Sequence, residues 1–115
     1  MRLKTALWVA AYLRRCQVEG LFAVVRRRGA EEAGAVFVRV SRLDGTSDLF
    51  GPAPQSVLDA VPSGGRVFAQ SLANRSTPDA DVEAYLERQI KFDPDLWIVE
   101  VEDKAGRNLL DLIAG

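Results

Sequence analysis

The sequence "VVRRRGAEEAGAVFVRV", residues 24–40, sets three consecutive arginines and two glutamates between two runs rich in valine. From 36 to 40, valine alternates with other residues, which is the two-residue period of a half-buried strand. Two glycines, Gly29 and Gly34, bracket the polar segment between the runs. The stretch therefore predicts two paired strands, at 21–28 and 35–42, joined by a polar hairpin loop.

Two helices are predicted, one before these strands in the chain and one after them. Residues 3–18 repeat apolar side chains at helical spacing, and Gly20 suits the position just past a helix end. The second helix is predicted to have Thr77 as its N-cap and Pro78 as its first residue, and to end near Phe92. Its inward side chains are expected to be Val82, Tyr85, Leu86, Ile90 and Phe92.

Further strands follow from turn signals and from runs of β-branched residues. The turn pair Asp44-Gly45 predicts a third, antiparallel strand through 48–50. Residues 67–72 and 96–103 predict two more, and the last of these has the strongest strand pattern in the chain. Residues 55–61 suggest a short helical segment, whereas residues 108–113 fit either a strand or a short helix.

This order of elements predicts one α+β domain over residues 1–115. We expect an antiparallel sheet of about four to six strands with two main helices packed on one face. Alternating strand–helix–strand units are absent from the pattern, which argues against a doubly wound nucleotide-binding fold.

The composition restricts the chemistry that the chain can perform. It has no histidine and only one cysteine, Cys16, so it lacks the usual general base near neutral pH and cannot form a disulfide within one chain. We therefore predict no catalytic residue and no cofactor, and a buried, structural role for Cys16. The N-terminal apolar stretch lacks a signal cleavage site and is too short to cross a bilayer, which predicts a cytoplasmic protein without a membrane partner.

The net charge of −1 hides two halves of opposite sign. Residues 1–50 hold nine Lys/Arg and five Asp/Glu (+4), whereas residues 51–115 hold six and eleven (−5). The basic half can bind an anionic partner, or the two halves can attract each other within one fold or across a dimer. The second interpretation is favoured, because nucleic-acid-binding domains are usually basic overall.

Two small groups of charged residues are candidate sites. The candidate anion site comprises Arg14, Arg15, Arg26, Arg27 and Arg28. On a strand, Arg26 and Arg28 should face one way and Arg27 the other, so the triplet is expected to be a solvated hairpin end, with Glu31 and Glu32 nearby to neutralise it.

The candidate metal site comprises Asp93 and Asp95, which flank Pro94. Carboxylates of this kind can hold a hard cation such as magnesium. The same spacing is also ordinary turn chemistry, in which an aspartate accepts hydrogen bonds from nearby backbone amides. The turn interpretation is favoured.

Four segments together carry a resemblance to a known family: "RLKTALWVAAYLRRC", "RRGAEEAGAVFVRV", "LFGPAPQS" and "FDPDLWIVEVED". In this order, over nearly the whole chain, they resemble the domain-of-unknown-function family DUF1491 of small bacterial proteins. The resemblance implies a short cytosolic bacterial protein, and it implies no activity, cofactor or catalytic residue.

Three hypotheses for function follow. The leading one is a small cytosolic, non-enzymatic interaction domain with a protein partner, and a homodimer is one form of it. The first alternative is weak binding of nucleic acid or another anionic ligand by the five arginines. The second is a metal-dependent enzyme that uses Asp93 and Asp95.

Overall fold

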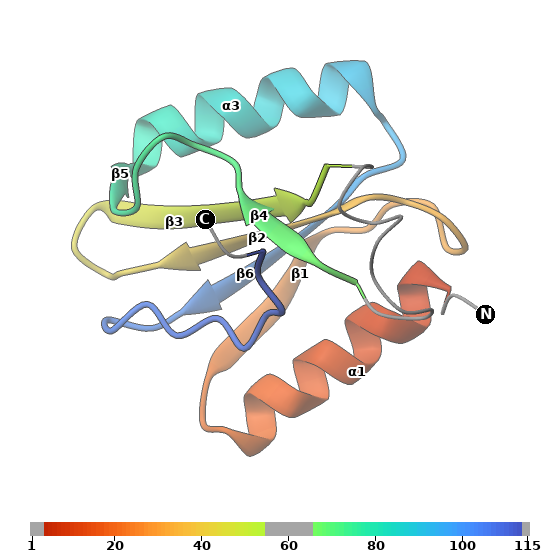
Figure 1. Ribbon diagram of the computed structural model, residues 1–115, viewed down its shortest axis with the longest axis horizontal. Helices are drawn as coiled ribbons and strands as arrows, with labels where there is room; N and C mark the ends of the chain where they lie inside the picture. Colours follow the sequence, from red (N-terminus) through yellow and green to blue (C-terminus); the bar gives the residue numbers. More distant parts are fainter. Residues whose placement is uncertain (1–3, 55–65, 114–115) are drawn as a thin grey trace.

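The structure is a computed structural model that describes residues 4–54 and 66–113 (Figure 1). A six-stranded mixed sheet forms its middle layer, with α1 (Thr5–Val18) on one face and α3 (Asp79–Phe92) on the other. The strands are β1 (Phe22–Arg27), β2 (Val36–Ser41), β3 (Thr46–Pro52), β4 (Phe68–Gln70), β5 (Thr77–Pro78) and β6 (Trp97–Glu102). The predicted α+β class is confirmed.

The helices lie on opposite faces of the sheet, so their expected placement on one face is wrong. The reason is that the inner strands β2 and β6 carry apolar side chains on both faces. Val38 and Val99 point into the core under α1, whereas Phe37 and Ile98 point into the core under α3. A strand that is apolar on both faces is stable only where both faces are covered.

The strand order is β1-β6-β2-β3-β4, with β5 paired to β3. β6 lies between β1 and β2, antiparallel to β1 and parallel to β2. The predicted hairpin between residues 21–28 and 35–42 is therefore wrong, although both strands exist. The expected antiparallel sheet is accordingly a mixed one: among the strand pairs of the described residues, β2–β6 is parallel and the others are antiparallel.

The segment between β1 and β2 does not end in a free hairpin tip. It covers the start of α1, where the backbone amides of Thr5 and Ala6 donate to the carbonyl oxygens of Glu32 and Glu31. Ala30 on the same segment accepts a hydrogen bond from the Trp97 indole at 2.8 Å. The segment thus accepts hydrogen bonds from backbone amides of the first turn of α1, which have no partner within the helix, and it holds the start of β6 in place.

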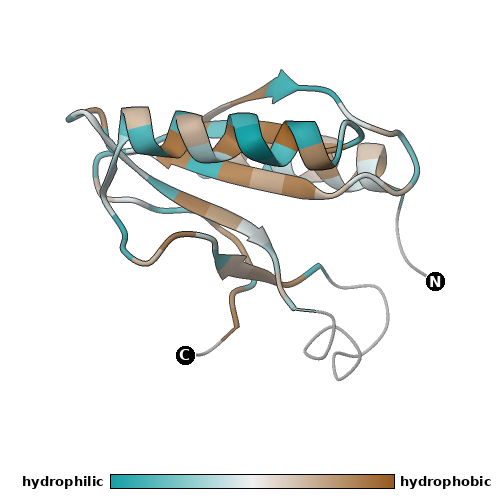
Figure 2. Cartoon of the chain, turned by 90° about the horizontal axis from the view of Figure 1, so that it is seen from above, coloured by the Kyte–Doolittle hydropathy of each residue, from teal (hydrophilic) through white to brown (hydrophobic). Residues whose placement is uncertain are grey.

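The core has one cluster on each side of the sheet. Under α1, Tyr12 and Cys16 pack against Trp97 and Val99, and part of the C-terminal segment lies against them. Under α3, Val82 and Leu86 pack against sheet residues. Viewed from above, α3 carries both hydrophobic and hydrophilic residues, as expected for a helix with one face on a sheet (Figure 2).

Of the remaining predictions, two are confirmed, one is decided against both alternatives, and one lies outside the described residues. The antiparallel β2–β3 pair and the strand β4 are confirmed. Residues 103–113 form neither a regular strand nor a helix, apart from one bridge between Leu112 and Phe68. The helical segment predicted at 55–61 lies outside the described residues.

The end of α3 at Phe92 is confirmed, whereas its start and one of its expected inward side chains differ from the prediction. Thr77 and Pro78 form β5, and α3 begins at Asp79 with no side-chain cap, so Thr77 as N-cap is wrong. The Thr77 hydroxyl instead donates to the carbonyl oxygen of Asn74. Phe92 is 85% exposed and does not belong to the inward side chains. Within the ranges 4–54 and 66–113, neither helix has the length and apolar character that a bilayer span requires.

We predict that Gly29→Ala destabilises the fold more than Gly20→Ala does. A Cβ at Gly29 would stand 2.1 Å from the carbonyl oxygen of Asp95, so β6 and its preceding loop would have to move. A Cβ at Gly20 meets nothing within 4 Å and suffers only from its φ of 78°. Overpacking costs about 1–3 kcal/mol or more, whereas the left-handed conformation costs about 1–2 kcal/mol. Urea unfolding measures both, and an equal or smaller loss for Gly29→Ala would contradict the close packing.

Candidate functional site

The arginine triplet is divided by a β-bulge. In the β1–β6 ladder Val25 lies opposite Val99 and Arg27 lies opposite Ile98, so Arg26 is an extra residue in β1. A bulge interrupts the strict alternation of side chains. As a result Arg26 reaches α3, whereas Arg28 lies over the Trp97 ring on the α1 side. The expectation that Arg26 and Arg28 share a face is wrong.

Each arginine of the triplet contacts another part of the chain, Arg28 through an aromatic ring. Arg26 forms a two-pronged pair with Glu83 of α3, with one N–O distance of 2.6 Å. Arg27 donates to the carbonyl oxygen of Leu96 at 3.3 Å, and the Arg28 guanidinium carbon lies 4.9 Å from the Trp97 ring centre. The triplet is not the solvated end of a hairpin, because its side chains hold β1 to α3 and to the start of β6.

The other two predicted anion-binding residues, Arg14 and Arg15, lie on α1. Arg15 donates to the carbonyl oxygen of Leu109, and Arg14 lines a groove beside β1. Arg15 and Arg26 point to partners on opposite sides of the sheet. The structure therefore does not bring the five arginines together. Anion binding by them stays a prediction.

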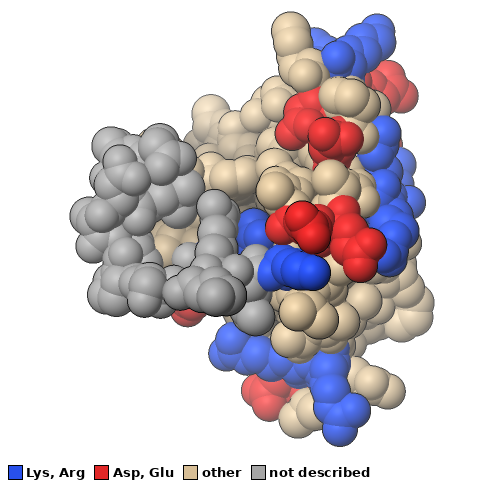
Figure 3. Space-filling view, turned by 90° about the vertical axis from the view of Figure 1, so that its right-hand side faces the viewer, with Lys and Arg blue, Asp and Glu red and all other residues tan. Residues whose placement is uncertain are grey.

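Basic and acidic side chains are interleaved on the face that Figure 3 shows. Glu32, which was expected to neutralise the triplet, instead pairs with Lys4 at 3.5 Å. Both lie near the start of α1, away from the Arg26–Glu83 pair. The mixed signs on this face do not form the continuous basic surface that nucleic-acid binding requires.

A cluster of charged residues joins the sheet to α3, and we call it the Arg39 cluster. It comprises Arg26, Arg39, Ser47, Asp79, Glu83 and Glu100. The Arg39 side chain is 9% exposed and pairs with Asp79 at 2.9 Å, with Glu100 at 3.2 Å and with Glu83. Three carboxylates thus surround one buried guanidinium, and such a group is stable only when it is paired.

The Arg39 cluster lowers the pKa of two carboxyl groups, those of Glu83 and Asp79. Hydrogen bonding from Arg26 lowers the pKa of Glu83, and the nearby positive charge of Arg39 acts in the same direction. Hydrogen bonding from the Ser47 hydroxyl lowers the pKa of Asp79, and Arg39 again contributes. Its ion pairs connect the basic half of the sequence with the acidic half. The predicted attraction between the halves within one fold is confirmed.

Asp93 and Asp95 form a turn at the end of α3. The Asp93 carboxylate accepts a hydrogen bond from the backbone amide of Asp95 at 3.1 Å. In the part of the chain that the structure describes, no three acidic or cysteine side chains are grouped closely enough to hold a metal ion. The geometry is that of the turn interpretation, and a metal role for these two residues stays a prediction.

Cys16 is fully buried under the sheet, as predicted. Burial raises the pKa of its thiol, and burial likewise raises the pKa of Tyr12, whose hydroxyl donates to the carbonyl oxygen of Asn108 at 2.7 Å. A protonated thiol without access to solvent is a poor nucleophile. The side chain therefore serves packing.

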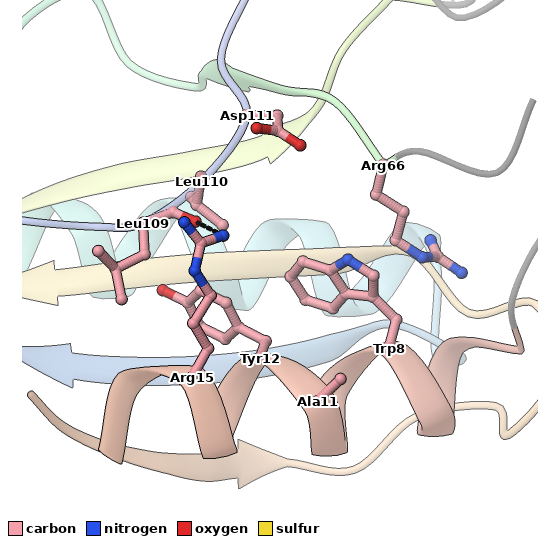
Figure 4. Close-up of a pocket in the computed structure, with 8 residues that line it drawn as sticks. All are labelled: Trp8, Ala11, Tyr12, Arg15, Arg66, Leu109, Leu110 and Asp111. Carbon is pink, nitrogen blue, oxygen red and sulfur yellow. Dashed lines mark hydrogen bonds between the residues drawn. The ribbon is translucent and has the colours of Figure 1, made fainter. Parts of the chain in front are cut away.

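A small pocket of about 160 Å³ lies between α1 and the C-terminal segment (Figure 4). Trp8 and Tyr12 stack with their ring centres 5.0 Å apart at its base. Arg15 and Arg66 stand at its two sides and bond to Leu109 and Thr5 of the same chain. The arginines of this pocket thus already hold the C-terminal segment and the start of α1 in place.

The edge of the sheet at β1 carries three exposed apolar side chains close together in the sequence. Phe22, Val24 and Val25 are 59, 40 and 36% exposed, on a strand that is paired on one side by β6. Among the described residues, no segment pairs with the other side of β1. A groove of about 530 Å³ runs beside it, lined by residues of α1, by Leu21 and by the first two residues of β1.

The opposite edge of the sheet is covered by the chain. The backbone amide of Phe68 in β4 donates to the carbonyl oxygen of Asp111, and its carbonyl accepts from Ile113. The two edges therefore differ: the C-terminal segment covers β4, whereas β1 carries apolar side chains that are open to solvent. We take the β1 edge as the candidate functional site.

Comparison with known proteins identifies the family. A family model described as "Protein of unknown function (DUF1491)" matches residues 3–111. The chain belongs to the DUF1491 family. The resemblance seen in the four sequence segments is thereby confirmed.

Solved structures of DUF1491 relatives agree in fold. A crystal structure of a DUF1491 family protein from Caulobacter crescentus CB15 is 39% identical, has a TM-score of 0.78, and matches over 99% of this chain and 100% of that chain. The solution structure of protein Atu0922 from A. tumefaciens is 43% identical, with a TM-score of 0.82, over 100% and 98% of the two chains. No functionally curated protein matches. The comparisons thus establish the family and fold and assign no activity.

Sequence reasoning missed both the Arg39 cluster and the open edge, although each left a signal. Arg39 stands between Val38 and Val40 in a buried strand, which indicates an internal ion-pair partner. Residues 22–25 are four apolar residues in succession, a pattern that predicts cover on both faces. The chain itself leaves part of that cover missing.

We predict that acid weakens the fold through the Arg39 cluster. Glu83 and Asp79 have a lower pKa in the folded protein than in the unfolded chain, where such carboxyls titrate near about pH 4. Below that pH the unfolded chain binds more protons, so the free energy of unfolding falls as the pH drops through the folded pKa values. Urea unfolding from pH 6 to pH 3 measures the slope, which should be flatter in Glu83→Gln and unchanged in Glu87→Gln on the exposed face of α3. Equal slopes in all three proteins would contradict this role.

Proposed function

We propose that this protein is a non-enzymatic interaction domain of the cytoplasm that forms a homodimer through the β1 edge. The observation that carries the proposal is the unpaired apolar strand. An edge strand presents a row of backbone donors and acceptors, and natural proteins cover, charge or shorten such edges. Here three of the four apolar residues at 22–25 are open to solvent, and Arg26, which follows them, is paired with Glu83.

A second copy of the chain fits this edge because the edge is self-complementary. Two β1 strands that run antiparallel about a two-fold axis form one continuous sheet, in which each copy supplies the missing hydrogen-bond partners of the other. The exposed side chains of Phe22, Val24 and Val25 then lie against apolar side chains of the other copy. Burial of this apolar area favours association by about 25 cal/mol for each Å².

The arrangement of the arginines supports self-association over anion binding. The two-pronged pair with Glu83 neutralises Arg26 and holds its side chain toward α3. Without that pair, a cation would stand on the edge and hinder strand pairing, as lysine does on many natural edge strands. The pair thus keeps the β1 edge compatible with a neighbour. The absence of histidine, and a single, buried cysteine, support a role without catalysis in a reducing compartment.

We predict that Val24→Lys abolishes dimer formation and leaves the fold intact. The substituted cation would stand within the paired edges, beside apolar side chains of the other copy. The matched control is Phe92→Lys, which removes an apolar side chain that is 85% exposed at the end of α3. Sedimentation equilibrium gives the oligomeric state, and circular dichroism checks the fold.

The expected result is a dimer for the wild type and for Phe92→Lys, and a monomer for Val24→Lys. A wild-type protein that stays monomeric at every concentration tested would refute the proposal, and so would a Val24→Lys variant that dimerises as strongly as the wild type. Loss of the dimer in Phe92→Lys alone would place the interface at α3 instead of β1.

A further inference from the structure

We infer that the two β1 edges pair antiparallel because Glu19 of each copy meets the partner's Arg27 and Arg28. The inference rests on the proposed self-association, and it names the residues that set the orientation of the dimer. It starts from the charges at the two ends of β1. One acidic residue stands just before the strand, and two basic residues stand at its end and just after it.

The charges at the two ends are accessible. Glu19 is exposed at the C-cap of α1, where its backbone amide donates to Arg15. Arg28 is exposed, and Arg27 is partly so. Arg26 is a different case, because Glu83 and Glu100 lie within 4.0 Å of its guanidinium and neutralise it. The free positive charge of the edge therefore gathers beyond Arg26, at the end of β1 opposite to Glu19.

Antiparallel pairing matches these charges and parallel pairing opposes them. In an antiparallel pair the start of one strand lies beside the end of the other, so the acidic end of each copy meets the basic end of its partner. A parallel pair would set the arginines of both copies side by side, and like charges placed directly opposite each other are destabilising. The two-fold axis doubles the effect, because the contact occurs twice.

The register of the exposed apolar residues brings the charges within reach. Strand pairing buries most apolar side chain when it is centred on Ala23 or Val24, within the regular part of β1 before its bulge. Centred on Ala23, the antiparallel register sets Leu21 opposite Val25 of the other copy, so the turn at Glu19 and Gly20 comes beside the end of that copy's β1. Centred on Val24, it sets Phe22 opposite Arg26, and the turn stays within reach of the long arginine side chains at that end.

Charge exchange between two variants tests the inference. The first variant is Glu19→Arg, and the second is the double variant Arg27→Glu/Arg28→Glu. Each alone should weaken homodimer formation by about tenfold or more, because every contact at the ends of the strand becomes a like-charge contact. An equimolar mixture of the two should form a heterodimer, since all the contacts are then attractive. Fluorescence energy transfer between differently labelled variants measures the mixed species.

Matched controls separate this effect from a general change in charge. Glu87→Arg and the double variant Arg88→Glu/Lys91→Glu alter the net charge by equal amounts at exposed positions on α3, away from β1. They should dimerise like the wild type. If the double variant Arg27→Glu/Arg28→Glu does not fold, the single variant Arg28→Glu replaces it in the experiment, because it leaves the hydrogen bond from Arg27 to Leu96 in place.

The outcomes distinguish this inference from the proposed function. A wild type that dimerises and is disrupted by Val24→Lys, together with variants that show no exchange, overturns the antiparallel charge pairing and leaves the β1 interface standing. A wild type that is monomeric throughout overturns both. Recovery of the heterodimer in the mixture, with no recovery for the control pair, supports the inference.

Discussion

The position of β6 is the constraint on which the rest of the structure depends. Its apolar side chains alternate between the core under α1 and the core under α3, so the strand is stable only at the centre of a sheet that is covered on both faces. It therefore lies between β1 and β2, and its parallel alignment with β2 requires the long crossover that α3 provides. A consequence is that β1, which would otherwise pair with β2, becomes an edge.

Ion pairs hold α3 against the sheet, and they also affect which charges stand at the β1 edge. Arg39 on β2 binds carboxylates on both α3 and β6, and Arg26 on β1 shares two of them. The same contacts that fasten α3 to the sheet thus draw a cation away from the open side of β1. In this way the Arg39 cluster and the exposed β1 edge are connected, although Arg39 itself is buried.

Local features were predictable from the sequence, whereas long-range pairings were not. Valine alternation placed β2, and the pair Asp44-Gly45 placed the turn before β3, because both signals involve neighbours in the chain. The prediction of a β1–β2 hairpin was wrong because a polar segment between two glycines has the same sequence pattern in a hairpin loop and in a loop that covers the start of a helix. The bulge at Arg26 depends on β6, some 70 residues away in sequence, and no local pattern predicts it. The exposed edge could be recognised only once β6 was placed.

The most direct test of the account is a search for contacts between two copies across β1. An equimolar mixture of isotope-labelled and unlabelled protein, studied by isotope-filtered nuclear Overhauser spectroscopy, reports only contacts between different molecules. The account predicts cross-peaks between backbone α-protons within residues 22–25, where antiparallel strands bring these protons close together. Intermolecular cross-peaks that arise from any other surface, with none from β1, would contradict it.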